Sequence, residues 1–220
     1  MKMVRDRTGR FPERPHWEID ELEQRCEEAM LSFLRERYGF ERIPVPTEAL
    51  TELIERHADF DVKPNLSDAR YDVFGYTDFE PGHKPLVIIA SELWEQRYRN
   101  NRLRMTLGHE CGHVIFHGPL YAKYPGAAAP QRCYWKDLLP TAGVVDWMEW
   151  QAAYAGGALL MPISYVRRTV VAFLRGRKEA APLKKGLATA LALSERIALT
   201  FDVSTAAATV RLAQLGYLTD

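Results

Sequence analysis

The chain has 220 residues, of which 47% are hydrophobic and 26% charged, a composition that is typical of a globular protein and excludes extended disorder. Basic and acidic residues number 29 each, so the net charge points to neither a nucleic-acid nor a membrane partner. No apolar run reaches the roughly 18–20 residues that a membrane span needs. Residues 1–14 are basic but lack the apolar segment of a secretory signal. The cysteines Cys26, Cys111 and Cys133 form no disulfide framework, which favours a reducing, cytoplasmic location.

The N-terminal part of the chain predicts two helices. The first spans Trp17 to about Arg37, where apolar residues recur at helical spacing opposite a glutamate-rich face, and Gly39 is expected to end it. The second is predicted to begin at Thr47, with that threonine as its cap. Residues 58–70 are predicted to form a loop.

The middle of the chain predicts a small sheet followed by helices. The segments 71–79 ("YDVFGYTDF") and 84–90 ("KPLVIIA") are predicted strands joined through a Pro-Gly turn. A short helix is expected from Ser91 to near Asn101, and a histidine-containing helix follows it.

The sequence after the histidine helix predicts a proline-rich loop followed by further helices. Residues 118–145 are rich in proline and are predicted to lack regular structure, and a loop of that length inside a domain is usually functional. A helix is predicted from near Asp146 to Met161, and the rest is predicted to be helical with breaks at Gly176 and Pro182.

The segment "RMTLGHECGHVIFHGPL" contains the pattern His-Glu-x-x-His. His109 and His113 lie four residues apart and therefore share a helix face, so that both rings can approach one cation. Glu110 is displaced by about 100° around the helix, where it can reach a metal-bound water without binding the metal. Zinc suits two imidazoles and lowers the pKa of its bound water to about 7, so a nearby carboxylate can accept the proton as the water attacks a carbonyl.

A third ligand is needed, because two histidines four residues apart also occur on ordinary helices. His117 lies roughly 12 Å from His109 along the helix axis, which is too far for one tetrahedral centre. His117 is therefore expected to be structural, to support a ligand, or to close the helix end. Glu149, in "DWMEWQAAYAGGALLMP", is the preferred third ligand, and the alternative is a solvated helix residue.

Small residues on both helices predict that the two pack closely. A glycine inside a helix costs roughly 1 kcal/mol relative to alanine, and close packing is a reasonable compensation. The small residues are Gly108 and Gly112 on the first helix, and Ala152, Ala153, Ala155, Gly156 and Gly157 on the second.

Three motifs in this order resemble the ImmA/IrrE family of metallo-endopeptidases. They are the strand "KPLVIIA", the helix "RLRMTLGHECGHVIFH" and the segment "EWQAAYAGGALLMP", and the resemblance covers about residues 45–165. It implies that His109, His113 and Glu149 hold Zn²⁺ and that Glu110 is the general base. The fold expected is α+β and mostly helical, a zincin-like domain with a small β-sheet before the active-site helix and a C-terminal helix-turn-helix-like hairpin.

The resemblance also implies a function. It predicts a cytoplasmic zinc endopeptidase that cleaves a specific protein substrate, a transcriptional repressor or similar regulator, without a membrane partner. The alternative is a DNA-binding or protein-interaction regulator with a structural or decayed metal site. The family usually has Asn or Asp four residues after the ligand glutamate, where this chain has Ala153. Loss of a group that orients a zinc histidine typically costs about 10–100-fold in affinity or activity, so Ala153→Asn is expected to strengthen the site.

Other candidate residues carry less information. Cys111 lies on the apolar stripe of the histidine helix and is expected to be a core residue. Cys133, in the proline-rich segment, is a candidate for an inhibitory fourth metal ligand. Tyr134, Tyr165 and Arg167 are candidates for stabilising an oxyanion, and the sequence does not choose among them.

The C-terminal segment, residues 166–220, is predicted to be helical and to pack on the domain formed by residues 1–165. It ends in a helix, a turn and a second helix capped by Ser204. Specific DNA binding is not expected, because the last helix offers only Arg211 and Gln214 for reading bases. Seven basic residues between positions 167 and 185 leave open a weak affinity for DNA or for an acidic protein surface.

Overall fold

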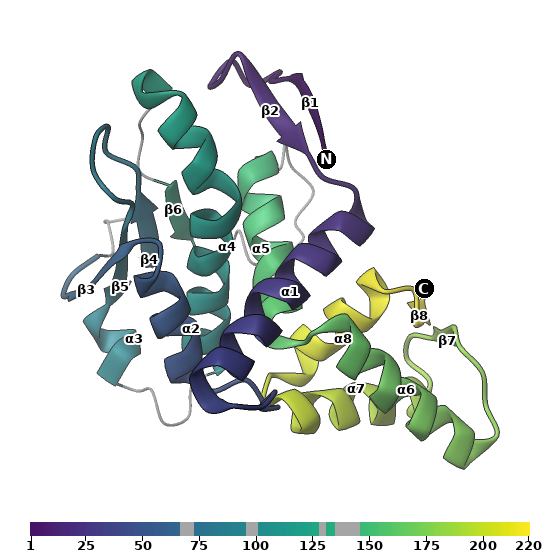
Figure 1. Cartoon of the computed structure of the whole chain (residues 1–220). Helices are drawn as coiled ribbons and strands as arrows, with labels where there is room; N and C mark the ends of the chain where they lie inside the picture. Colours follow the sequence, from purple (N-terminus) through teal and green to yellow (C-terminus); the bar gives the residue numbers. More distant parts are fainter. Residues whose placement is uncertain (67–72, 96–100, 128–130, 135–145) are drawn as a thin grey trace.

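The computed structural model describes residues 1–66, 73–95, 101–127 and 146–220, and the backbone of residues 131–134. The fold is α+β, as predicted, with helices predominating and the strands forming small sheets (Figure 1). The chain starts with an antiparallel hairpin that the sequence did not predict, formed by β1 (Lys2–Arg5) and β2 (Glu13–His16).

The largest sheet has four strands in the order β3-β5-β4-β6. The predicted hairpin is confirmed, since β4 (Val73–Asp78) and β5 (Leu86–Ala90) pair antiparallel. The prediction of a loop over residues 58–70 is wrong at β3 (Asp59–Lys63), which pairs in parallel with β5. A five-residue strand stabilised by a non-local partner leaves little local signal. The fourth strand, β6 (Gln131–Tyr134), pairs antiparallel with β4.

The remaining elements are helices and one pair of very short parallel strands. Within the described ranges, no single helix is long and apolar enough to cross a membrane, and α5 and α6 pass that test only as a pair bent by 61°. The elements are α1 (Ile19–Tyr38), α2 (Thr47–Glu55), α3 (Ser91–Glu95), α4 (Asn101–Lys123), the 3₁₀ helix η2 (Pro125–Ala127), α5 (Trp147–Leu160), α6 (Ile163–Arg177), β7 (Leu183–Lys184), α7 (Ala188–Phe201), α8 (Thr205–Gln214) and β8 (Leu218–Thr219).

Two of the predicted helix ends are confirmed, and one predicted cap is wrong. Gly39 ends α1 with a φ of +80°, which glycine adopts without strain, and the Ser204 hydroxyl accepts from the backbone N–H of Ala207 at the start of α8. Thr47 begins α2 but does not cap it. Its hydroxyl oxygen accepts a hydrogen bond from Arg104 of α4 instead.

The prediction that residues 118–145 lack regular structure is wrong in its described parts. Helix α4 continues through Pro119 to Lys123, and η2 and β6 follow. Gly118, which precedes this proline, presents no Cβ to clash with the proline ring, so one of the obstacles to a proline inside a helix is absent. Leu120 and Tyr121 are buried in a small apolar cluster that stabilises this last part of the helix.

The main apolar core is one cluster that extends across residue 165. It joins Leu22 of α1, Leu107 of α4, Leu159 of α5 and Leu212 of α8. The C-terminal helices therefore share a core with the helix that carries the histidines.

Two buried arginines join distant elements, a placement that the sequence does not predict. Arg104 donates to the backbone carbonyl of Phe201 at the end of α7 (3.1 Å) and to that of Val45 before α2 (2.8 Å). Arg211 of α8 forms an ion pair with Glu23 of α1, and their side chains are only 1% and 4% exposed. Arg211, considered above as a base-reading residue, is thus inside the protein.

Candidate metal centre

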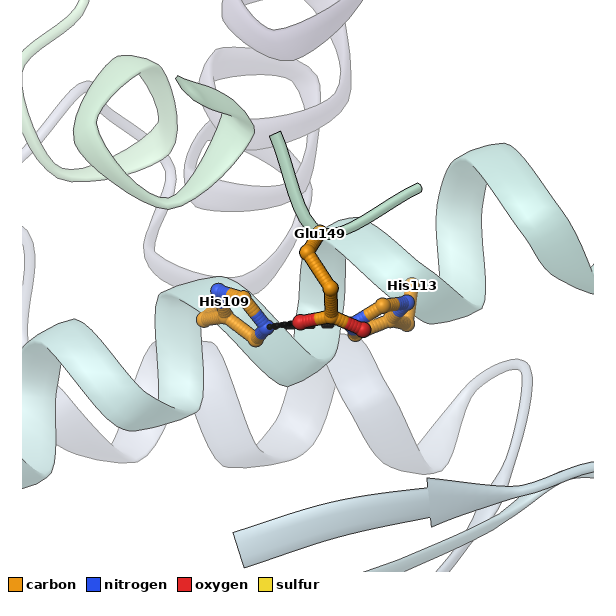
Figure 2. Close-up of side chains that lie close together, drawn as sticks. All are labelled: His109, His113 and Glu149. Atoms are coloured by element: carbon orange, nitrogen blue, oxygen red, sulfur yellow. Dashed lines mark hydrogen bonds and ion pairs between the residues drawn. The ribbon is translucent and has the colours of Figure 1, made fainter. Parts of the chain in front are cut away.

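Two adjacent helices bring the three predicted ligands together. His109 and His113 lie one turn apart on α4, and the carboxylate of Glu149, from the first turn of α5, lies between their rings (Figure 2). One nitrogen or oxygen atom from each residue lies within 4.8 Å of the others, so the cluster could hold a metal ion. The Asp146 side chain caps α5 by accepting from the backbone N–H of Met148 and so fixes the start of the helix that carries Glu149.

Glycines allow α4 and α5 to approach this closely, as the sequence predicts. A Cβ on Gly156 would lie 2.9 Å from the backbone nitrogen of His109, and a Cβ on Gly108 would lie 3.0 Å from the backbone of Gly156. A Cβ on Gly112 would similarly lie 3.0 Å from the backbone of Ala152. Both glycine positions on α4 therefore touch the backbone of α5, which brings Glu149 within reach of the histidines.

The spacing of the donor atoms suits a small tetrahedral cation. The Nε2 atoms of His109 and His113 are 3.0 Å apart. The oxygens of Glu149 are 3.1 Å from Nε2 of His109 and 3.4 Å from Nε2 of His113. Ligand atoms at 2.0–2.1 Å from a tetrahedral zinc are separated by roughly 3.3–3.4 Å. The donor set therefore fits zinc with shifts of a few tenths of an ångström.

The ligand cluster is almost completely enclosed. Both histidines are fully buried, and the side chain of Glu149 is 14% exposed. Burial acts to raise the pKa of Glu149, but the neighbouring His113 and His109 outweigh it and hold that pKa well below its usual range. Glu149 is therefore an anion, as a metal ligand must be.

Glu110 is buried beside the cluster, and only one of its two carboxylate oxygens has a hydrogen-bond partner among the described residues. Thr77 of β4 donates its hydroxyl to Oε2 at 2.7 Å. Oε1 is buried and has no hydrogen-bond partner among the described residues. Burial raises the pKa of Glu110, although His109, His113 and the Thr77 hydrogen bond act in the opposite direction. A carboxylate in this state is suited to accepting a proton from a water in the site.

His117 lies behind His113 and is not part of the ligand cluster. Its Nδ1 is 2.9 Å from Nδ1 of His113, and its Nε2 is 3.1 Å from the side-chain oxygen of Gln151. Burial lowers the pKa of His117 well below its usual value, and so does the neighbouring His113, which keeps the ring neutral. His117 does not close the helix end, because α4 continues to Lys123.

One arrangement of protons is consistent with a metal on Nε2 of His113. His113 then donates from Nδ1 to Nδ1 of His117, and His117 donates from Nε2 to the carbonyl oxygen of Gln151. The acceptor that the resemblance places four residues after Glu149 is Ala153 here, and Gln151, two residues after Glu149, ends this hydrogen-bonded chain instead. Neither Gln151 nor Thr77 belongs to the motif, so the sequence alone does not reveal their place at the site.

The other candidates lie elsewhere or outside the described residues. Cys111 is fully buried in the core, and burial raises the pKa of its thiol to about 12, which suits the predicted core role. Tyr165 donates its hydroxyl to Glu41, and Arg167 is exposed on α6. The side chains of Cys133 and Tyr134 and the whole of residues 135–145 lie outside the described part of the chain.

Neither a protein-family model nor a curated protein matches this sequence. The chemistry assigned to the site therefore depends on the geometry of its own residues.

Proposed function

We propose that this chain is a cytoplasmic zinc endopeptidase with a zincin-like fold, of the ImmA/IrrE type, which cleaves a specific regulatory protein such as a transcriptional repressor. The observation that carries the proposal is the convergence of His109, His113 and Glu149 at distances that suit zinc, with Glu110 buried beside them. The order of the three sequence motifs supports the same family.

The three ligand residues would hold the zinc, while Glu110 and Thr77 handle the proton. Zinc, when bound, supplies a Lewis acid that polarises the scissile carbonyl and lowers the pKa of a water to about 7. Glu110 accepts the proton of the attacking water at Oε1, while Thr77 holds Oε2 in place. Burial acts to raise the pKa of Glu110, which makes its carboxylate a stronger proton acceptor. Glu110 then gives the proton to the leaving amine.

The number of ligands favours catalysis over a structural metal. Structural zinc sites are usually closed by four protein ligands, whereas catalytic sites keep a position open for water or substrate. The described residues offer three protein ligands, His109, His113 and Glu149. A set of three ligands among the described residues supports the peptidase over the alternative, a regulator with a structural site.

A proteome-wide cleavage experiment tests the proposal. The zinc-loaded full-length protein is added to a native lysate of its source cells, and new N-termini are identified by mass spectrometry. We expect a small set of new termini with the wild type and slow cleavage of unfolded casein. With Glu110→Gln, we expect cleavage to fall about a thousandfold while zinc is retained. Equal cleavage by the two proteins, or none by a fully zinc-loaded wild type, would refute the proposal.

A further inference from the structure

A pocket lies between the N-terminal hairpin and the first residue of α5. Its volume is about 450 Å³, within the range of 300–1,000 Å³ that is usual for ligand sites. The pocket lining includes Lys2, Arg5, Asp6, Arg7, Arg14 and Trp147.

The pocket has an excess of positive charge. Four of its lining residues are lysine or arginine, and none of these four forms an ion pair with a carboxylate among the described residues. Asp6 is the one acidic group in the lining, and its carboxylate already accepts from the backbone N–H groups of Thr8 (3.0 Å) and Phe11 (3.1 Å). Asp6 therefore organises the hairpin loop and interacts with Arg14. The exposed side chains of Lys2, Arg5 and Arg7 remain to pair with an anion.

One residue of the pocket lining, Trp147, packs against His117, which lies behind the ligand His113. The guanidinium of Arg14 lies 4.6 Å from the centre of the Trp147 ring, which is 5.5 Å from the ring of His117. The ring of His117 is in turn 5.0 Å from that of His113. Arg10 of the hairpin also forms an ion pair with Asp146, which holds the hairpin against the end of α5 from which Glu149 projects (Figure 1).

We propose that this basic pocket binds acidic side chains of the protein that the metal centre cleaves, a proposal that rests on the proposed function. The ring contacts through the buried His117 place Trp147 at most roughly 10 Å from His113. An extended peptide rises about 3.3 Å per residue, so about three residues can span that distance. Arginine pairs with carboxylates through two parallel hydrogen bonds, which gives such a pocket selectivity. A concave pocket suits a peptide side chain, whereas a nucleic-acid backbone needs a longer track of cations.

Fluorescence anisotropy of a labelled peptide tests this proposal. The probe is a fluorescein-labelled peptide with four consecutive glutamates, compared with the same peptide carrying four glutamines. The protein is the full-length, zinc-loaded Glu110→Gln variant, which leaves the probe uncut. At about 0.15 M salt we expect it to bind the glutamate peptide and not the glutamine peptide.

Two matched double variants locate the site. Arg5→Gln with Arg7→Gln removes two pocket cations and is expected to weaken binding about tenfold. Arg167→Gln with Arg175→Gln removes the same charge from the exposed face of α6 and is expected to change binding less than about twofold. Thermal melting of both proteins confirms that each is folded.

Three results would overturn the proposal: equal weakening by the two double variants, equal binding of the glutamine peptide, or tighter binding of a single-stranded DNA 20-mer than of the glutamate peptide. Failure of this proposal can be separated from failure of the peptidase proposal, because the assay measures binding without hydrolysis. If the wild type cleaves its substrate but the probe does not bind, only the pocket proposal is refuted.

Discussion

Gln151 is the residue that ends the hydrogen-bonded chain behind the candidate metal ligands. Its side-chain oxygen accepts from His117, whose other nitrogen faces His113, and all three residues are buried. Because the ring of His113 has this partner on one side, its orientation toward Glu149 and His109 is fixed before a metal binds. The resemblance assigns this role, orienting a zinc-binding histidine, to an acceptor at position 153.

Replacing Gln151 is therefore expected to weaken metal binding without removing a ligand. Gln151→Met keeps the size of the side chain and removes the acceptor, and we expect zinc affinity to fall about tenfold. Gln151→Glu keeps an acceptor oxygen and should retain most of the affinity. Competition with a chromogenic chelator measures both, and thermal melting of the metal-free proteins controls for folding. Unchanged affinity in Gln151→Met would show that His113 is oriented by another group.

At the scale of elements, the decisive feature is the close contact between α4 and α5. The backbone of Gly156 touches that of Gly108 and His109, so a small shift of α5 would move Glu149 away from both histidines. The geometry of metal binding thus depends on helix packing at Gly108 and Gly156, although neither glycine contributes a ligand.

Adding one methyl group at this contact should damage both stability and metal binding. Gly156→Ala places a Cβ 2.9 Å from the backbone nitrogen of His109, which cannot move aside, so we expect a loss of about 1–3 kcal/mol in the free energy of unfolding and weaker zinc binding. Gly176→Ala is the matched control, since a Cβ there meets nothing within 4 Å. It should stabilise α6 by about 0.5–1 kcal/mol. Urea denaturation measures both changes, and a Gly156→Ala protein as stable as the wild type would contradict the packing argument.

The sequence predicts elements well where the signal is local. Helix α1 combines a regular apolar stripe with Gly39 at its end, and α5 lies between Asp146 and Pro162, so both were located closely. The close packing of α4 and α5 was predictable because glycine inside a helix is costly and needs a reason.

Prediction failed where distant residues decide the structure. Strand β3 depends on its parallel partner β5, and Thr47 bonds to Arg104 rather than capping its own helix. At the site, His109, His113 and Glu149 were identifiable from spacing and resemblance. Thr77 and Gln151 were not, because an isolated Thr or Gln carries no pattern before the chain folds.

At the scale of the whole molecule, one buried ion pair links the C-terminal helix α8 to the N-terminal helix α1. Arg211 of α8 pairs with Glu23 of α1 and also donates to the backbone carbonyl of Met161 at the end of α5 (3.1 Å). The pair thus connects the last helix to the first and to the helix that carries Glu149. It also removes Arg211 from any surface that would meet DNA.

Breaking this pair should destabilise the whole chain. Arg211→Met leaves the carboxylate of Glu23 buried without its cation, and we expect a loss of about 3–5 kcal/mol in the free energy of unfolding. The double variant Glu23→Leu with Arg211→Met removes both charges and should recover part of that loss, because the buried Tyr154 hydroxyl then lacks the acceptor that Glu23 provides. Chemical denaturation followed by circular dichroism measures these changes. A single variant within about 1 kcal/mol of the wild type would mean that the pair does not stabilise the fold.

Zinc content is the measurement that tests the central claim most directly. Wild-type, Glu110→Gln and Glu149→Ala proteins are purified without chelator and analysed by elemental mass spectrometry, with circular dichroism as a check on folding. We expect about one zinc per chain in the wild type and in Glu110→Gln, because Glu110 is not a ligand, and almost none in Glu149→Ala, which loses one of three protein ligands. A folded wild-type protein without metal, or full zinc occupancy in Glu149→Ala, would contradict the assignment of this site.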